Sequence, residues 1–240
     1  MRNTFRTHFV SLRPHFGFTS LLILFSLIYL SGCNRLGGKA SREGVIEYAI
    51  AYPPETMQDN VLASMMPSKM TVKFKNNMSL SEIKFGMGIM DACFISNPEK
   101  KILITLLQIV DKKYALVSDS TSINEQLRKS PAVDVTFLDE IKTIAGYKCK
   151  KAVVKDNTNT TYDVFYTNDL KLKESNWYLP LNKIGGVLFE YNIRQNNMLM
   201  KLTATSVTDE KIDDTAFTIP KDYKVVTKQE MPEIFSQFFQ

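Results

Sequence analysis

The sequence predicts a mainly β domain built as an antiparallel sheet with few helices. Apolar and polar residues alternate with period two from Gly44 onward, first at Ile46, Tyr48, Ile50 and Tyr52. This alternation is typical of strands that bury one face and expose the other. Turn residues separate such segments at short intervals, as expected of an antiparallel sheet or barrel, and we expect roughly ten strands.

The elements follow in order along the chain. Further strands are expected at 70–74, 133–137, 162–166 and 198–202, with turns at Asn76-Asn77, Gly86 and Gly88, Asn97-Pro98, Asp111-Lys112, 156–160, Gly185-Gly186 and Asn196-Asn197. Helical signals are few. Ser120–Lys129 ends before Ser130-Pro131, and Met57–Met66 stops before Pro67. Residues 230–240 place Ile234, Phe235, Phe238 and Phe239 at helical spacing, which suits either a terminal amphipathic helix or a frayed tail.

The first 32 residues have the layout of a signal peptide. Arg2, Arg6 and Arg13 precede the apolar run 21–30, and this run has about half the roughly 20 residues that a spanning helix needs. The sequence Leu30-Ser31-Gly32-Cys33 resembles the lipobox of bacterial lipoproteins. That resemblance implies cleavage between Gly32 and Cys33, lipidation of Cys33, and anchoring to a membrane by acyl chains. Asn34 follows Cys33, which favours the outer membrane, facing the periplasm.

The expected organisation is therefore a signal peptide at 1–32, a flexible tether at 33–43 containing Gly37-Gly38, and one β-rich domain at 44–240. Removal of the leader takes away three arginines and no acidic residue, so the net charge falls from +5 to +2. Such a balance attracts nucleic acid weakly, and we expect no nucleic-acid partner.

The leader also holds both histidines, His8 and His15. Without them, a Ser-His-Asp or Cys-His nucleophilic site and a histidine-ligated metal site are excluded from the mature chain. We expect no cofactor, no metal and no catalytic residue. Cys93 and Cys149 remain after lipidation of Cys33, and two states are open for them: a disulfide in an oxidising envelope, or two separate buried thiols.

Three short motifs carry a family resemblance. They are "GVIEYAI" at 44–50, "IAGYKCKKA" at 144–152 and "IDDTAFTIPKDY" at 212–223. In this order they resemble an uncharacterised family of Gram-negative exported proteins, similar to GLPGLI proteins and to the LolA/LolB lipoprotein-localisation group. The GLPGLI signature itself is replaced by "KIGGVLF" at 183–189. The resemblance implies a curved antiparallel half-barrel with short covering helices, whose concave surface holds acyl chains.

Several residue clusters suit either a site or ordinary structure. Methionines at Met65-Met66, Met87 with Met90, and Met198 with Met200 suit an adaptable pocket or a core, and a Cu(I) site is the least favoured interpretation. Trp177-Tyr178, with Phe189 and Tyr191, suits the rim of a ligand opening or core packing. Acidic pairs at Asp139-Glu140, Asp209-Glu210 and Asp213-Asp214 suit solvated turns better than glycoside hydrolysis.

The sequence thus favours a non-catalytic envelope lipoprotein that binds a hydrophobic or amphiphilic ligand, such as an acyl chain or a lipoprotein, in a half-barrel. The alternative is a lipid-anchored interaction protein that binds another envelope protein through exposed strand edges or the C-terminal helix. A hydrolase built on the acidic pairs comes third.

Overall fold

A computed structural model describes residues 42–57, 65–157, 160–195 and 198–238. The leader, Cys33 and the predicted tether as far as residue 41 lie outside these residues, as does most of the segment expected to be helical at 57–66. Glu43, the last residue of the predicted tether, already belongs to the first strand. The described residues all fall in one compact unit. Among them, no helix is long and apolar enough to cross a membrane.

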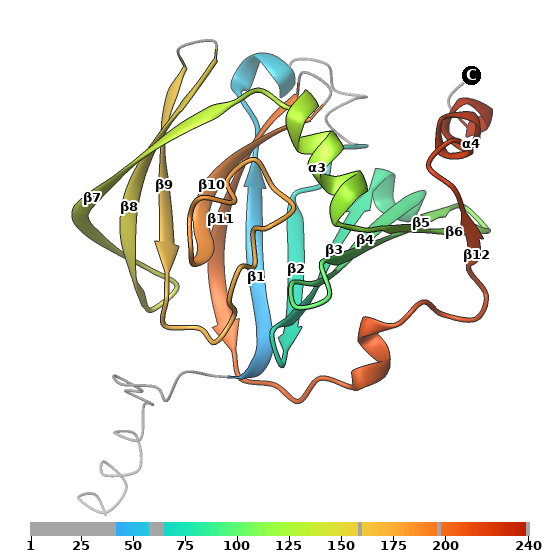
Figure 1. The fold of residues 1–240 in the computed structure, drawn as a ribbon, viewed down its shortest axis with the longest axis horizontal. Coiled ribbons are helices and arrows are strands. Elements are labelled where there is room, and N and C mark those ends of the chain that lie inside the picture. The colour runs from blue at the N-terminus through green and yellow to red at the C-terminus, as the bar shows by residue number, and fades with distance from the viewer. Residues whose placement is uncertain (1–41, 58–64, 158–159, 196–197, 239–240) are drawn as a thin grey trace, which may run out of the picture. The chain divides into compact units, whose positions relative to one another are not determined.

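Twelve strands form a single sheet, and Figure 1 shows it as a curved, open surface. Their bounds are β1 Glu43–Ala51, β2 Lys69–Lys75, β3 Met78–Phe85, β4 Met90–Asn97, β5 Ile102–Ile109, β6 Lys112–Ser118, β7 Val133–Ile144, β8 Tyr147–Asp156, β9 Thr161–Thr167, β10 Val187–Gln195, β11 Met198–Thr208 and β12 Lys224–Val226. Their spatial order is β12-β6-β5-β4-β3-β2-β1-β11-β10-β9-β8-β7. All neighbours pair antiparallel except β12, which runs parallel to β6. The predicted mainly β fold with an open antiparallel sheet is confirmed.

The helical elements are short. The α-helices are α3 Ser120–Lys129 and α4 Met231–Phe238, and the 3-10 turns are η1 Pro54–Met57, η2 Gly86–Gly88 and η3 Asp214–Phe217. The predicted bounds of α3 are confirmed, although its cap is one residue earlier than the predicted start. Asp119 is this cap, because its side chain accepts a hydrogen bond from the Ser122 amide at 2.9 Å.

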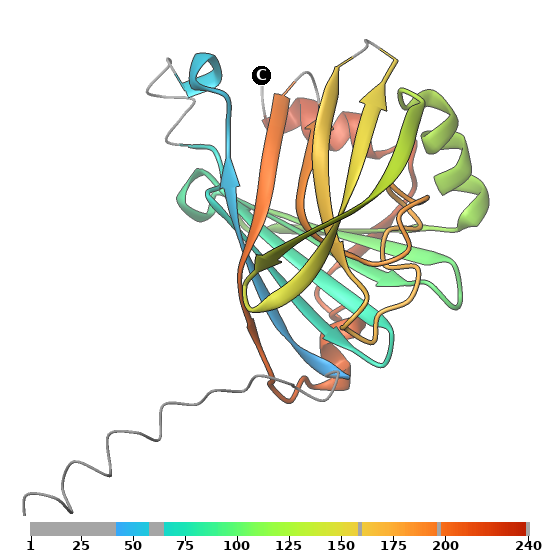
Figure 2. The same ribbon diagram turned by 90° about the vertical axis from the view of Figure 1, so that its left-hand side faces the viewer.

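The inner face of the sheet, which carries Ile46, Tyr48 and Ile50, is covered by the chain that connects β9 to β10. This connection, residues 168–186, packs Leu170, Leu172, Leu181 and Ile184 into the same apolar core as β1. Figure 2 shows it inside the bend of the sheet, beside α3. The concave surface is therefore occupied by the protein's own side chains.

The outer face of β3 to β6 is covered by the C-terminal segment. Leu80 points away from the inner-face residues Ser79 and Ser81, and it packs in a second cluster with Ile212 and Phe217. The chain then adds β12 to the edge of the sheet, and α4 packs Ile234 beside Val226. β5 is buried from both sides. This explains why apolar and polar residues do not alternate with period two along Ile102–Ile109.

Candidate functional site

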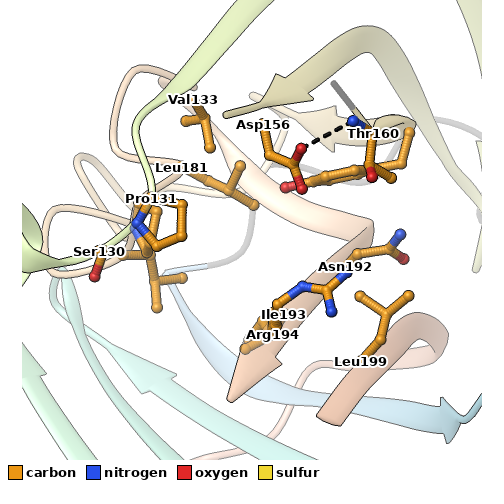
Figure 3. Close-up of a pocket in the computed structure, with 13 residues that line it drawn as sticks. Ser130, Pro131, Val133, Asp156, Thr160, Leu181, Asn192, Ile193, Arg194 and Leu199 are labelled. Atoms are coloured by element: carbon orange, nitrogen blue, oxygen red, sulfur yellow. Dashed lines mark hydrogen bonds between the residues drawn. The ribbon is translucent and has the colours of Figure 1, made fainter. Parts of the chain in front are cut away.

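The candidate site is a pocket of about 130 Å³ at one end of the sheet. Four chain segments contribute to it: the α3–β7 link, the β8–β9 turn, the β9–β10 connection and the β10–β11 hairpin (Figure 3). Its lining residues are Ser130, Pro131, Val133, Asp156, Thr160, Tyr162, Leu179, Pro180, Leu181, Asn192, Ile193, Arg194 and Leu199.

Local sequence explains how one wall is placed. The Ser130 amide closes α3 by donating to the Gln126 carbonyl at 3.1 Å, and Pro131 prevents the helix from continuing. The chain leaves the helix at once and enters β7 at Val133. Lys183 of the β9–β10 connection donates to the Val133 carbonyl at 3.2 Å, which holds this wall against the connection.

The opposite wall is a short turn between β8 and β9. Asp156 stabilises it twice: its amide donates to the Thr160 carbonyl at 3.0 Å, and its carboxylate accepts from the Thr160 amide at 2.9 Å (Figure 3). Tyr162 follows on β9. Burial raises the pKa of Tyr162, the Asp156 carboxylate raises it further and Arg194 opposes them, so the phenol is neutral at physiological pH.

The β10–β11 hairpin supplies the polar group best placed to meet a ligand. Arg194 is exposed at the pocket, and its guanidinium forms no ion pair or hydrogen bond within the described part of the chain. Ile193 and Leu199 are partly buried beside it. The pocket thus combines an apolar interior with one cationic side chain that is free to bind an anion.

A second hollow, of about 280 Å³, lies on the outer face between β4, β5 and η3. It is larger, but its wall is built from the cluster under the C-terminal segment, including Ile95 and Phe217. Of its two charged residues, Asp214 is paired with Lys75 at 2.8 Å. We therefore take the first pocket as the candidate site.

The sequence-predicted site residues do not come together. Within the described residues Cys93 and Cys149 form no disulfide: both are free thiols, on strands with six others between them. Of the two states open from sequence, the structure has separate thiols. Burial raises the pKa of Cys93 to about 11 and that of Cys149 to about 12, which keeps both protonated at neutral pH.

The aromatic and acidic motifs are structural. The Trp177 indole donates to Ser96 Oγ at 2.9 Å, and the partly buried Tyr178 ring packs edge-on against it. Asp213 caps η3 by accepting a hydrogen bond from the Thr215 amide at 2.8 Å, so this acidic pair lies in a turn, as expected. Glu140 lies within β7 rather than at a strand end, and pairs with Lys151 at 3.1 Å. In the described part of the chain no cluster of His, Cys, Asp and Glu could hold a metal ion.

The family-model comparison matches residues 54–231 and describes the family as "N-glycanase peptide, N-terminal domain". The match covers most of the chain. The chain belongs to this family. The resemblance to GLPGLI and LolA/LolB proteins was therefore wrong. Its motif at 144–152 spans the β7–β8 turn, where Ala145 and Gly146 adopt positive φ angles of 47° and 82°. Turns of this kind recur in unrelated sheets, which is why the motif misled. No curated protein matches the chain.

The pocket residues of this domain were not found from the sequence. Arg194, Asn192 and Leu181 carry no local signature, and they meet because three turns lie at the same end of the sheet. The order of the strands in the sheet determines which residues meet at the pocket. The alternation of apolar and polar residues along the sequence does not reveal that order. The proline after α3 was visible in the sequence, but only as a helix stop.

Proposed function

We propose that this domain is a membrane-anchored binding module, which takes the apolar end of a small amphiphilic ligand into the pocket and holds an anionic end at Arg194. The supporting observation is the pairing of an apolar lining with an exposed guanidinium that has no partner within the described residues. The inner face is filled by the β9–β10 connection, so the ligand is assigned to the pocket and not to the concave surface.

The pocket's size limits the ligand. About 130 Å³ is small beside the roughly 300–1,000 Å³ of sites that enclose a drug-sized molecule. The pocket therefore holds one end of a ligand, such as the terminal part of an acyl chain. The anchor in this proposal is lipidated Cys33, which lies outside the described residues, and the proposed place is the outer membrane, facing the periplasm.

Thermal unfolding of the full chain in vesicles tests the binding proposal. Hexanoate, whose short chain matches the pocket, should raise the Tm in a concentration-dependent way, because a ligand that binds only the folded state stabilises it. Hexylammonium, with the opposite charge, should raise it less. Arg194→Gln should remove the difference between the two probes, whereas an equal response to both in the native chain would contradict the proposal.

A second candidate ligand is a glycan. Tyr162, Asp156 and Asn192 bring one aromatic ring and two polar side chains to the pocket, a combination that suits sugar hydroxyls and a sugar face. The family description names an N-glycanase, which gives this candidate its motivation. In the same experiment chitobiose replaces hexanoate, and a Tm increase that requires Asn192 rather than Arg194 would favour the glycan.

A further inference from the structure

The β7–β8 hairpin carries an exposed apolar group at its edge strand. Phe137, Leu138 and Ile141 of β7 are 51%, 40% and 59% exposed. Large apolar side chains that cluster on a surface are typical of interaction sites. β7 is also the last strand of the sheet, so no described strand covers its outer edge.

Two lysines lie on the same face of the hairpin. Ile141 pairs directly with Lys150, and Thr143 pairs with Lys148, so the side chains of Ile141, Lys148 and Lys150 project to one side. Both lysines are exposed, and within the described residues their ammonium groups form no ion pair or hydrogen bond. Lys142, by contrast, is held by Glu190 at 3.0 Å.

The strand directions place this hairpin at the end of the sheet where the chain enters. β1 starts at Glu43, and alternation of direction through β11, β10, β9 and β8 brings the turn at Ala145-Gly146 to the same end. The pocket, which lies at the β8–β9 and β10–β11 turns, is at the opposite end. Figure 2 shows the start of β1 and the β7–β8 turn toward the lower side.

This placement brings the hairpin within reach of the proposed anchor. Ten residues separate Cys33 from Glu43, and ten residues span at most roughly 36 Å. Five strand spacings separate β1 from β7, about 24 Å along the sheet. A bilayer that holds Cys33 is therefore accessible to this end of the domain.

We propose that Phe137, Ile141, Lys148 and Lys150 form a membrane-docking patch, which binds anionic lipid headgroups through the lysines and places the apolar side chains in the bilayer interface. The inference rests on the anchor of the proposed function. Apolar side chains beside unpaired lysines suit an anionic interface. A second copy is disfavoured as the occupant, because the register break between Phe137 and Ile141 interrupts the edge that another strand would extend. Docking here directs the pocket away from the bilayer.

Hydrogen exchange of the full chain tests the patch, in vesicles of phosphatidylcholine alone and with phosphatidylglycerol. Amides of β7 should be better protected on the anionic vesicles, and added salt should reduce the difference. Lys148→Gln and Lys150→Gln should each lower the ratio of docked to undocked protein about fivefold. The matched control changes Lys129→Gln and Lys155→Gln, two exposed lysines near the pocket end, and should have no effect.

Three outcomes would overturn the proposal, and they separate its failure from that of the anchor. If the protein stays bound to both vesicle types and the β7 amides exchange equally on both, the docking patch is contradicted while the lipid anchor is retained. If alkaline carbonate releases the protein from both vesicle types, the lipid anchor is contradicted, and so is the docking patch that rests on it. Protection that depends on protein concentration and not on lipid would identify a second copy as the occupant.

Discussion

The indole nitrogen of Trp177 donates a hydrogen bond to the hydroxyl of Ser96, 2.9 Å away and 81 residues earlier in the chain. Ser96 is fully buried on β4. This bond joins the β9–β10 connection to the far half of the sheet, so the connection fills the concave surface instead of leaving it open to a ligand. The filling leaves the pocket at one end of the sheet as the candidate ligand site.

Trp177→Phe should destabilise the domain by about 1–3 kcal/mol, because the Ser96 hydroxyl loses its donor while remaining buried. Urea unfolding followed by circular dichroism measures this change, with an unchanged m value expected. Trp177→Phe combined with Ser96→Ala should recover part of the loss. A shift below about 0.5 kcal/mol for the single variant would show that the bond does not hold the connection.

Gly186→Ala should destabilise the domain, while Gly185→Ala should have little effect. A Cβ on Gly186 would lie 2.7 Å from the Thr167 carbonyl oxygen, whereas a Cβ on Gly185 would meet nothing within 4 Å. Backbone must move to relieve the first contact, and we expect a cost of about 1–3 kcal/mol. Comparison of the two urea midpoints checks this, and equal midpoints would contradict the described packing.

The domain should lose stability at alkaline pH. Burial raises the pKa of Tyr48, Tyr178 and Tyr191 above that of an unfolded tyrosine, about 10. Their contribution is complete below pH 10 and falls as the pH rises toward the folded pKa, by about 1.4 kcal/mol per pH unit for each tyrosine.

Tyr48→Phe isolates one of these tyrosines. It removes the hydrogen bond to the Leu188 carbonyl at 2.8 Å. Above pH 10 the unfolding free energy should then fall less steeply with pH, by the contribution of one titrating group. Ile46→Val, which introduces no titrating group, should lower stability evenly across pH and leave the slope unchanged. Unfolding free energies between pH 9 and 11.5 provide the measurement. An unchanged slope in Tyr48→Phe would show that this phenol is not protected.

Cys93 and Cys149 should react slowly with a thiol reagent at pH 7.5 while the domain is folded, and both should react quickly in urea. Burial keeps them protonated, and the thiolate is the reactive form. Reaction of only one or neither thiol in urea without reductant would indicate oxidation, including a disulfide, which contradicts the free thiols of the structure.

Some of this architecture could be predicted from local sequence and some could not. β1 was predictable because Ile46, Tyr48 and Ile50 are buried in the core while the residues between them are more exposed. α3 was predictable because Pro131 stops it. β5 was hidden because the C-terminal segment buries its second face. Core packing, one of two alternatives for the aromatic cluster, is correct for Phe189 and Tyr191, which are buried in the main core. Arg194 was invisible, since its role depends on segments that meet only after the sheet has formed.

The family assignment shows the same limit. The residues around Ala145-Gly146 were distinctive as a string, yet their shared physical content is a tight hairpin turn. A turn constrains two strands and does not specify the family. The match over 54–231 draws on every described strand except β1, which short motifs could not represent.

Photolabelling tests most directly the central claim that the ligand site is the pocket at the sheet's end and not the filled concave face. Cells that express the full chain receive a decanoate carrying a diazirine at its tail, and labelled peptides are mapped after irradiation. We expect label on the peptides containing Leu179–Leu181 and Ile193. We also expect loss of that label in Leu199→Trp, which fills the pocket, and retention in Leu116→Trp, a half-buried position on β6. Label on β1 and β2 of the inner face, unaffected by Leu199→Trp, would contradict the claim.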